Sequence, residues 1–132
     1  MNLDGLKAIN DRYGHQARDA CLGRMADTFL CNVREGAWLA RWGGGEFLVV
    51  LWEEKGECKA NPALDRIAND LAENPVELPQ GDRIRLTYSA GVVRCAGNEN
   101  VELGTGGVLA LADEALYEAK REGKGSTFVC AR

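Results

Sequence analysis

At 132 residues the chain has the length of one domain with its own hydrophobic core. Its content of 45% hydrophobic and 27% charged residues is that of an ordinary globular protein, and no apolar run reaches the ~18–20 residues that cross a bilayer. The net charge of −4, with basic residues scattered along the chain, argues against a nucleic-acid groove. We therefore expect one domain over residues 1–132 with no nucleic-acid partner and no membrane contact.

Five cysteines occur without a CxxC motif and without the spacing of Cys and His metal ligands: Cys21, Cys31, Cys58, Cys95 and Cys130. An odd count without such spacing predicts small buried or half-buried thiols in a reducing compartment, not a disulfide frame or a zinc site. Met1 is not followed by a signal peptide. Both observations predict a cytoplasmic location.

Residues 2–15 begin with polar side chains that share a face. Asn2 and Asp4 stand two residues apart, so they point the same way on an extended chain. Carboxylate and carboxamide groups at the end of a strand are typical of contacts to a hard cation or a nucleotide. Solvated residues at a frayed terminus would give the same pattern, and both interpretations stay open.

Residues 16–33 have the periodicity of a helix. Apolar residues recur at steps of three and four and predict one buried stripe: Cys21, Leu22, Met25, Ala26, Phe29, Leu30 and Val33. Asp19 is predicted in the first turn, where the helix dipole favours a carboxylate. The alternative is that Asp19 contacts a ligand lying over the start of the helix. Residues 34–36 then end the helix.

A triple glycine, Gly43 to Gly45, lies between two apolar runs that are rich in aromatic and β-branched residues. This pattern predicts a central β-hairpin with strands over residues 41–44 and 46–52. Glycine at the tip lets a phosphate or another backbone come close, because no Cβ stands in the way. With Glu46 beside it, the tip suits a nucleotide site. The alternative is a simple tight turn.

The second half of the chain alternates helices and strands. Residues 53–60 predict a charged loop, and Asn61 and Pro62 predict the N-cap and first position of a helix that ends before residue 74. A turn at residues 79–82, a long strand at 84–93, a polar connection at 95–107, a helix at 108–121 and a strand at 126–131 follow. The order predicts an α/β domain with a mixed central sheet and helices packed on it.

Several stretches, in order, resemble the GGDEF family, the diguanylate cyclase domains that condense two GTP molecules into cyclic di-GMP. NLDGLKAIND at 2–11 resembles D-x-D-x-[FL]-K-x-I-N-D, and GHQARD at 14–19 resembles G-H-x-x-G-D. RWGGGEF at 41–47 resembles R-Y-G-G-D-E-F, and SAG at 89–91 resembles S-x-G. ADEALYEAKREGK at 112–124 resembles A-D-x-A-L-Y-x-A-K-x-x-G-[RK]. The resemblance covers nearly the whole chain and implies a nucleotidyl-cyclase-like fold with a ferredoxin-like core. The family usually begins earlier, with a helix bearing L-T-G-L-x-N-R and most of the first strand, so we expect an N-terminally truncated domain.

The resemblance implies nucleotide-binding roles for particular residues. Asn10 and Asp19 match the positions that hydrogen-bond guanine. Gly43 and Gly44 match the turn under the triphosphate, and Lys120 and Lys124 match the positions that hold its phosphates. Lys124 replaces the commoner arginine with a point charge.

The resemblance also implies a weakened metal site. The first Asp of D-x-D, a magnesium ligand, is Asn2 here, and the acid at the third signature letter is Gly45. The remaining metal candidates are Asn2, Leu3 and Glu46, with Glu46 also the candidate catalytic residue. Magnesium prefers charged oxygen ligands, so we expect weak or absent Mg²⁺ binding.

An inhibitory site of the R-x-x-D type would fall on residues 34–37. Arg34 remains, but Ala37 stands where the family has aspartate. A guanidinium contact to cyclic di-GMP could persist, whereas product feedback should be weak or absent.

Three functions stay open. The first is a degenerate domain that binds GTP or a partner and acts as a regulatory or dimerisation module. The second is a working diguanylate cyclase that recruits metal through Asp4, Glu46 and the main chain. The third, less favoured because of Ala37, is a receptor for cyclic di-GMP. In each case the expected partners are GTP or cyclic di-GMP, a second copy in the full-length protein, and other signalling domains on the same chain.

Overall fold

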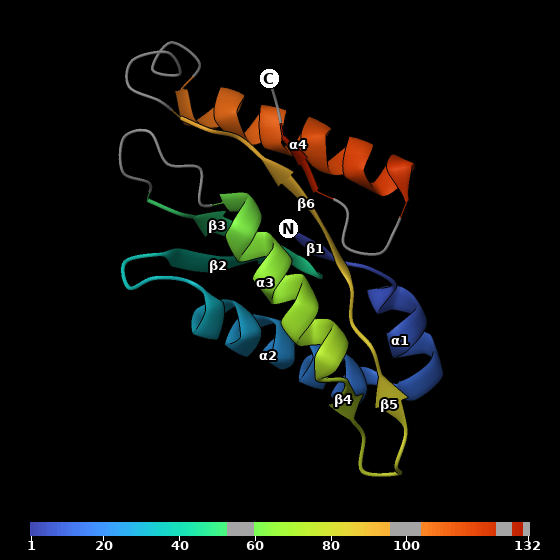
Figure 1. Ribbon diagram of the computed structural model, residues 1–132. Coiled ribbons are helices and arrows are strands. Elements are labelled where there is room, and N and C mark those ends of the chain that lie inside the picture. Colours follow the sequence, from blue (N-terminus) through green and yellow to red (C-terminus); the bar gives the residue numbers. More distant parts are fainter. Residues whose placement is uncertain (53–59, 96–103, 124–127, 131–132) are drawn as a thin grey trace.

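The computed structural model describes residues 1–52, 60–95, 104–123 and 128–130 (Figure 1). Its helices are α1 (Leu6–Tyr13), α2 (His15–Asn32), α3 (Ala60–Glu73) and α4 (Gly104–Glu122). Its strands are β1 (Asn2–Leu3), β2 (Trp38–Gly43), β3 (Glu46–Val50), β4 (Val76–Glu77), β5 (Arg83–Ile84), β6 (Tyr88–Val92) and β7 (Phe128–Cys130).

Five of the strands form one mixed sheet in the order β2-β3-β1-β6-β7. All neighbours are antiparallel except β6 and β7, which are parallel. Strands β4 and β5 form a separate antiparallel pair. The prediction of an α/β domain with a mixed central sheet is confirmed. The hairpin of β2 and β3 is confirmed as well, but β2 lies at an edge of the described sheet and not at its centre.

The two faces of the sheet are covered by different helices. On one face, residues of α2 and α3 such as Phe29 and Ile67 are buried in a single cluster with Phe47 and Tyr88 of the sheet. On the other face α4 packs against β6 and β7 (Figure 1). Adjacent residues of β6 point to opposite faces of the sheet, because side chains alternate along a strand. Ala90 is in the core cluster, whereas Gly91 faces α4.

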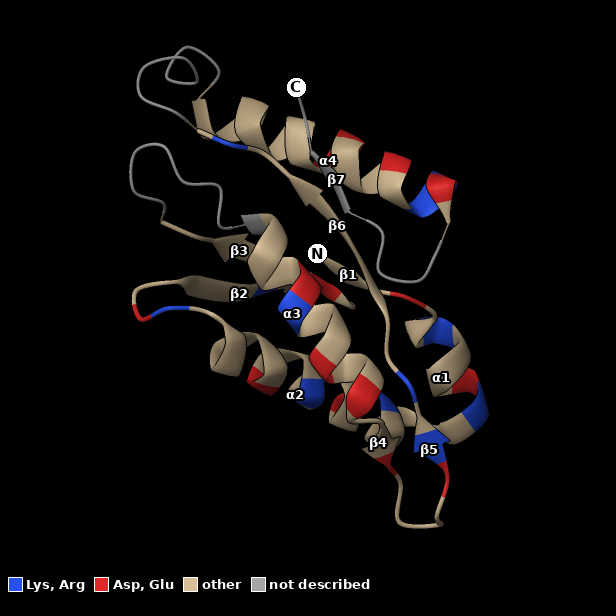
Figure 2. Ribbon diagram, in the orientation of Figure 1, with Lys and Arg blue, Asp and Glu red and all other residues tan. Residues whose placement is uncertain are grey.

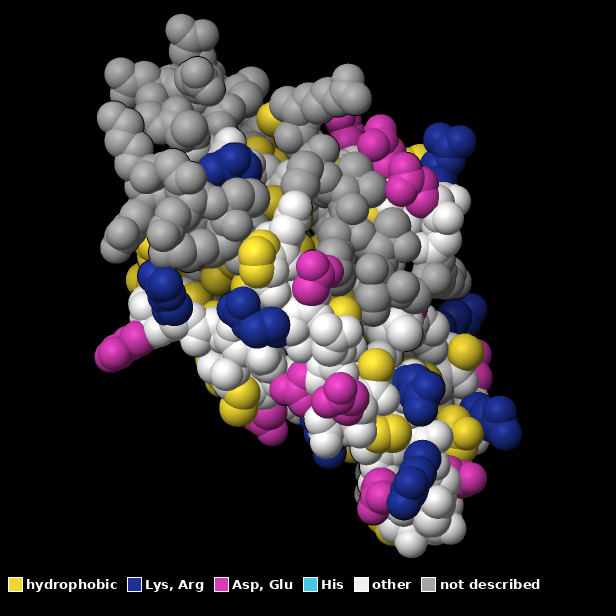
Figure 3. Space-filling model, viewed as in Figure 1, with side chains coloured by type: hydrophobic (Ala, Val, Ile, Leu, Met, Phe, Trp, Pro, Cys, Tyr) yellow, Lys and Arg dark blue, Asp and Glu magenta, His cyan; other side chains and the backbone are white. Residues whose placement is uncertain are grey.

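The outer face of the β2–β3 hairpin is apolar and exposed. Trp38 and Val50 are cross-strand partners, and both are exposed. Trp42 and Trp52 are also exposed. Elsewhere acidic and basic residues are interspersed along the helices (Figure 2), and the face seen in Figure 3 has no area covered by basic side chains alone among the described residues. No helix within the described ranges is long and apolar enough to cross a membrane.

The sequence pattern missed helix α1. Leu6, Ile9 and Tyr13 pack against the core at steps of three and four, which is a helical spacing. The helix is bounded by Gly5 and Gly14, whose φ angles are 68° and 89°. Only eight residues lie between these two glycines, so the periodic signal is short.

Several predicted boundaries were wrong, including those of the hairpin strands, because β2 spans Trp38–Gly43 and β3 ends at Val50. Helix α4 begins at Gly104 and not at residue 108, and α3 begins at Ala60, so that Asn61 lies inside the helix and is not its N-cap. Pro62 is still in the first turn, where its missing N–H costs nothing. The predicted strand at 84–93 is two strands, because β5 pairs with β4 whereas β6 pairs with β1 and β7.

Two predictions of burial were also wrong. Leu30 is 58% exposed, because it follows the buried Phe29 by one residue and is turned out of the stripe. Cys21 is buried as predicted, but Cys31 and Cys95 are exposed. Cys58, the predicted loop and most of the predicted polar connection lie outside the described residues.

We predict that Gly91→Ala destabilises the domain by about 2–3 kcal/mol. A Cβ on Gly91 would overlap the backbone of α4 at Ala112 and Leu116, and backbone cannot move aside cheaply. Gly23→Ala in α2 is the control: nothing lies within 4 Å of its Cβ position, so it should stabilise the helix by about 0.5–1 kcal/mol. Urea unfolding of the three proteins measures both changes, and equal stability of the Gly91 variant and wild type would contradict the packing.

A second prediction concerns the buried Tyr88, whose hydroxyl donates to the carbonyl of Leu64 at 2.6 Å. Tyr88→Phe leaves that carbonyl without this donor and should lower the free energy of unfolding by about 1–2 kcal/mol. Burial, with a smaller effect from Asp65, raises the pKa of Tyr88. Above a pH of about 10 the unfolded tyrosine ionises before the folded one, so the stability of wild type should fall with pH. The phenylalanine variant should lose less stability over the same range, which unfolding series from pH 8 to 11 would measure.

Candidate nucleotide site

Strand β1 lies in the middle of the sheet, which rules out a frayed terminus. Asn2 is aligned with Glu46 of β3 on one side and with Ser89 of β6 on the other. The Leu3 N–H donates to the Gly45 carbonyl at 3.1 Å. The polar residues of β1 are therefore held next to the start of β3, where the signature begins.

Asp4, directly after β1, is used to tie the chain to β6. Its Oδ2 accepts a hydrogen bond from the Thr87 hydroxyl at 2.8 Å, and its Oδ1 accepts one from the Ser89 hydroxyl at 2.9 Å. Its backbone N–H also donates to the Thr87 carbonyl at 2.9 Å. Both carboxylate oxygens thus have partners within the protein.

The end of the site expected to hold metal has one carboxylate beside an amide. The Asn2 Nδ2 donates to Glu46 Oε1 at 3.4 Å. The place of a side chain at residue 45 is taken by Leu6, whose Cδ2 lies 2.8 Å from the position that a Cβ on Gly45 would occupy. Gly45 does not have a positive φ, so the backbone itself would accept a side chain there.

Lys120 belongs to the same end of the site. The pKa of the Met1 amino group is lowered, mainly by burial. The carboxylates of Glu46 and Asp113 act in the opposite direction, and the positive charge of Lys120 adds to the lowering. Glu46 at the start of β3 and Lys120 in the last turn of α4 therefore both lie within electrostatic range of this amino group. Lys124 lies outside the described residues.

The end expected to hold the base is formed by α1 and the beginning of α2. Asn10 is on α1, and Arg18 and Asp19 are the fourth and fifth residues of α2. Asp19 therefore lies beyond the first turn, so the helix-dipole interpretation is wrong. The Arg18 Nη2 is 3.5 Å from Asp19 Oδ1. Asn10 Oδ1 and Arg18 Nε are buried and have no hydrogen-bond partner among the described residues.

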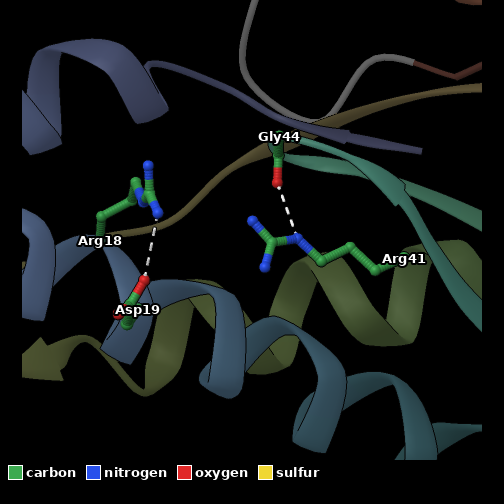
Figure 4. A network of polar contacts seen from close by, with 4 residues as sticks. All are labelled: Arg18, Asp19, Arg41 and Gly44. Carbon is green, nitrogen blue, oxygen red and sulfur yellow. Dashed lines mark hydrogen bonds and ion pairs between the residues drawn. The ribbon is translucent and has the colours of Figure 1, made fainter.

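The hairpin tip is held by a hydrogen bond from Arg41. Gly44 has a φ of 46°, a conformation that favours glycine, and its carbonyl accepts a hydrogen bond from Arg41 Nε at 3.1 Å. Figure 4 shows that the Arg41 guanidinium extends from the hairpin toward the first turns of α2, where Arg18 and Asp19 lie. Arg41 is thus the basic group that is hydrogen-bonded at the glycine tip.

The residues present do not fit a magnesium site of ordinary composition. In the described ranges no three His, Cys, Asp or Glu side chains lie close enough together to hold a metal ion. The donors at this end are the Glu46 carboxylate, the Asn2 amide and the main chain of Leu3, and Asp4 is hydrogen-bonded to β6. Mg²⁺ favours anionic oxygens in an octahedral arrangement, and this set offers one.

The predicted residues fall into two groups and one outlier. Asn2, Leu3, Glu46 and Lys120 lie at one end, and Asn10 and Asp19 lie at the other, with Gly43 and Gly44 at the hairpin tip. Arg34 follows the far end of α2, roughly 20 Å from Asp19 by helix length, and is exposed.

Sequence reasoning missed Arg18 and Arg41 as contributors. Arg41 matches the arginine that opens its quoted motif, whereas Arg18 stands where G-H-x-x-G-D has glycine and so departs from the family pattern. Their basic character next to Asp19 and the glycines was the available signal.

Comparison with known proteins agrees with this fold and motif order. A family model for the diguanylate cyclase GGDEF domain matches residues 1–126. The chain is 33% identical over 124 residues to diguanylate cyclase DosC of Escherichia coli K12, covering 94% of this chain and 26% of DosC. It is 36% identical over 124 residues to diguanylate cyclase DgcP of Pseudomonas aeruginosa, covering 94% of this chain and 18% of DgcP.

Among solved structures, the chain is similar to a shortened form of YfiN from Pseudomonas aeruginosa that comprises only the GGDEF domain. The TM-score is 0.84 at 29% identity, and the match covers 99% of this chain and 73% of that one. The chain spans about a quarter or less of the length of the two curated relatives. From the family match over residues 1–126 and the agreement in fold, we conclude that this chain belongs to the GGDEF family of diguanylate cyclase domains.

Proposed function

We propose that this GGDEF domain binds GTP and acts as a regulatory module of cyclic di-GMP signalling, with little or no cyclase activity of its own. The observation that carries the proposal is the contrast between the two ends of the candidate site. The base end keeps polar groups suited to guanine. The metal end lacks the anionic oxygens that phosphoryl transfer needs.

The base end supports nucleotide binding through its unpartnered polar atoms. A buried acceptor without a donor, such as Asn10 Oδ1, costs about 1–3 kcal/mol in the free protein. Guanine N1–H or N2–H would supply the missing donor. The side chain of Asp19 is 66% exposed, its ion pair with Arg18 is long at 3.5 Å, and it can accept from the same edge of the base.

The metal end supports the loss of turnover. A metal ion contributes several kcal/mol to phosphoryl transfer by neutralising charge on the triphosphate, which corresponds to on the order of 10²–10³ in rate. Gly45 offers no ligand, and the amide of Asn2 donates to Glu46. One carboxylate with an amide neighbour is a poor holder of Mg²⁺.

The alternative is a working diguanylate cyclase, which the activity named for DosC and DgcP favours. It would have to hold magnesium through Glu46 and the main chain. The hydrogen bonds that Asp4 accepts from Thr87 and Ser89 hold its carboxylate against β6. We therefore rank this function second. Binding of cyclic di-GMP at Arg34 ranks third, because Ala37 offers no acid.

The proposal predicts measurable GTP binding that depends on Asp19. Isothermal titration with GTP should show binding by wild type, and Asp19→Ala should weaken it by about 10-fold, because hydrogen bonds to charged groups contribute about 1.5–3 kcal/mol. Asp27→Ala is the matched control, since Asp27 is another exposed carboxylate two turns further along α2. Absence of any GTP binding by wild type would refute the proposed function.

The proposal also predicts that restoring the acids restores chemistry. Asn2→Asp with Gly45→Asp should raise cyclic di-GMP formation by on the order of 10²-fold, measured by chromatography of the products. Leu6 must move its methyl group to admit the new side chain, which a flexible side-chain end does cheaply. The chains are compared as fusions to a dimeric coiled coil, because two GTP molecules must face each other.

Gly45→Asn in the same fusion is the control for this experiment, since it has the size of aspartate without its charge. It should form no more cyclic di-GMP than wild type does. If the unmodified domain already converts GTP as fast as the restored one, the domain is an ordinary cyclase and the proposal is wrong.

A further inference from the structure

Arg18 stands beside the carboxylate that is proposed to bind guanine. It is the residue before Asp19 on α2, and its Nη2 lies 3.5 Å from Asp19 Oδ1. In Figure 4 the two side chains lie together at the start of α2, and a dashed line marks their contact. A donor and an acceptor are thus presented side by side.

Stability does not account for this arrangement. The side chains of Arg18 and Asp19 are 34% and 66% exposed, and ion pairs of that exposure contribute only about 0–1 kcal/mol. The Arg18 Nε is nevertheless buried and has no acceptor within the described part of the chain. A buried donor without an acceptor disfavours the folded state, so neither the ion pair nor the burial of Nε explains this arrangement through stability.

The unpartnered atoms have opposite polarity. Asn10 Oδ1 lacks a donor, and Arg18 Nε lacks an acceptor, among the residues that the structure describes. Guanine offers both kinds of group on one edge, where the O6 acceptor stands next to the N1–H and N2–H donors. The order of donor and acceptor in the Arg18–Asp19 pair is complementary to the order of O6 and N1–H in guanine.

We propose that Arg18 donates to O6 of guanine while Asp19 accepts from its N1–H and N2–H, so that the two consecutive residues select guanine together. This inference rests on the proposed GTP binding. Adenine has an amino group where guanine has O6, and that amino group would meet a guanidinium that can only donate. The pair would therefore disfavour ATP in two ways: the amino group of adenine would face the guanidinium, donor against donor, and the hydrogen bonds to O6 and from N1–H would be lost.

The guanidinium, and not charge alone, carries the selectivity. Arginine presents several N–H donors in a rigid plane, which matches the acceptor edge of guanine, whereas lysine is a point charge. Arg18→Lys should keep the electrostatic attraction for the triphosphate and lose part of the preference for guanine. Arg18→Ala should lose both.

The test compares the affinities of four proteins for two ligands, measured by isothermal titration. The ligands are GTP and 6-thio-GTP, in which a sulfur that accepts hydrogen bonds weakly replaces O6. The proteins are wild type, Arg18→Ala, Arg18→Lys and, as a charge-matched control, Arg83→Ala, which removes an exposed arginine of β5 that pairs with Glu77.

Wild type and the Arg83 variant should bind GTP at least about 5-fold more tightly than 6-thio-GTP. Arg18→Ala should bind GTP at least about 5-fold more weakly than wild type and should bind the two ligands equally. Circular dichroism melting confirms that the variant is folded.

Two results would overturn the inference while leaving GTP binding intact. Arg18→Ala could bind GTP as tightly as wild type or more tightly, which would show that Arg18 only competes for Asp19. Alternatively, the preference for GTP over 6-thio-GTP could persist without Arg18. If wild type binds neither ligand, the proposed function and this inference fail together.

Discussion

The position of β1 between β3 and β6 is the constraint on which the candidate site depends. Its two residues pair on both sides, and Asp4 just beyond it receives hydroxyl groups of Thr87 and Ser89. These contacts join residues more than eighty positions apart in the chain. The same strand places Asn2 against Glu46 and directs the chain into α1. A site made from three separate motifs therefore has one short strand as its common support.

The two ends of the site differ in what they leave unsatisfied. At the base end, polar atoms of Asn10 and Arg18 are buried without partners in the described structure. At the metal end, by contrast, the polar groups satisfy one another: Asp4 is bound to β6, and Asn2 donates to Glu46. A buried group without a partner gains a full hydrogen bond when a ligand supplies one, whereas a group that already has a partner gains less. The physical asymmetry favours nucleotide binding over metal-dependent turnover.

Much of the fold could be predicted because its signals are local. The hairpin followed from glycines between apolar runs, and the buried stripe of α2 followed from helical spacing, with Leu30 as the exception. The break between β5 and β6 could not be predicted, because apolar and polar residues alternate along 84–93 as in one strand. The two halves pair with different strands, β4 and β1, and only the tertiary structure shows this. Helix α1 was missed because eight residues carry too little periodicity.

The sequence by itself determined the α/β class and the order of the motifs, because these depend on residue type and spacing, and the resemblance then implied which residues to expect at guanine. Only the tertiary structure decided how those residues are used. Asp4, a metal candidate of the cyclase hypothesis, accepts hydrogen bonds from Thr87 and Ser89, and the Arg18 guanidinium lies beside Asp19. Hydrogen-bond partners come from distant strands and from side-chain rotamers, and neither is encoded in the local pattern that a sequence displays.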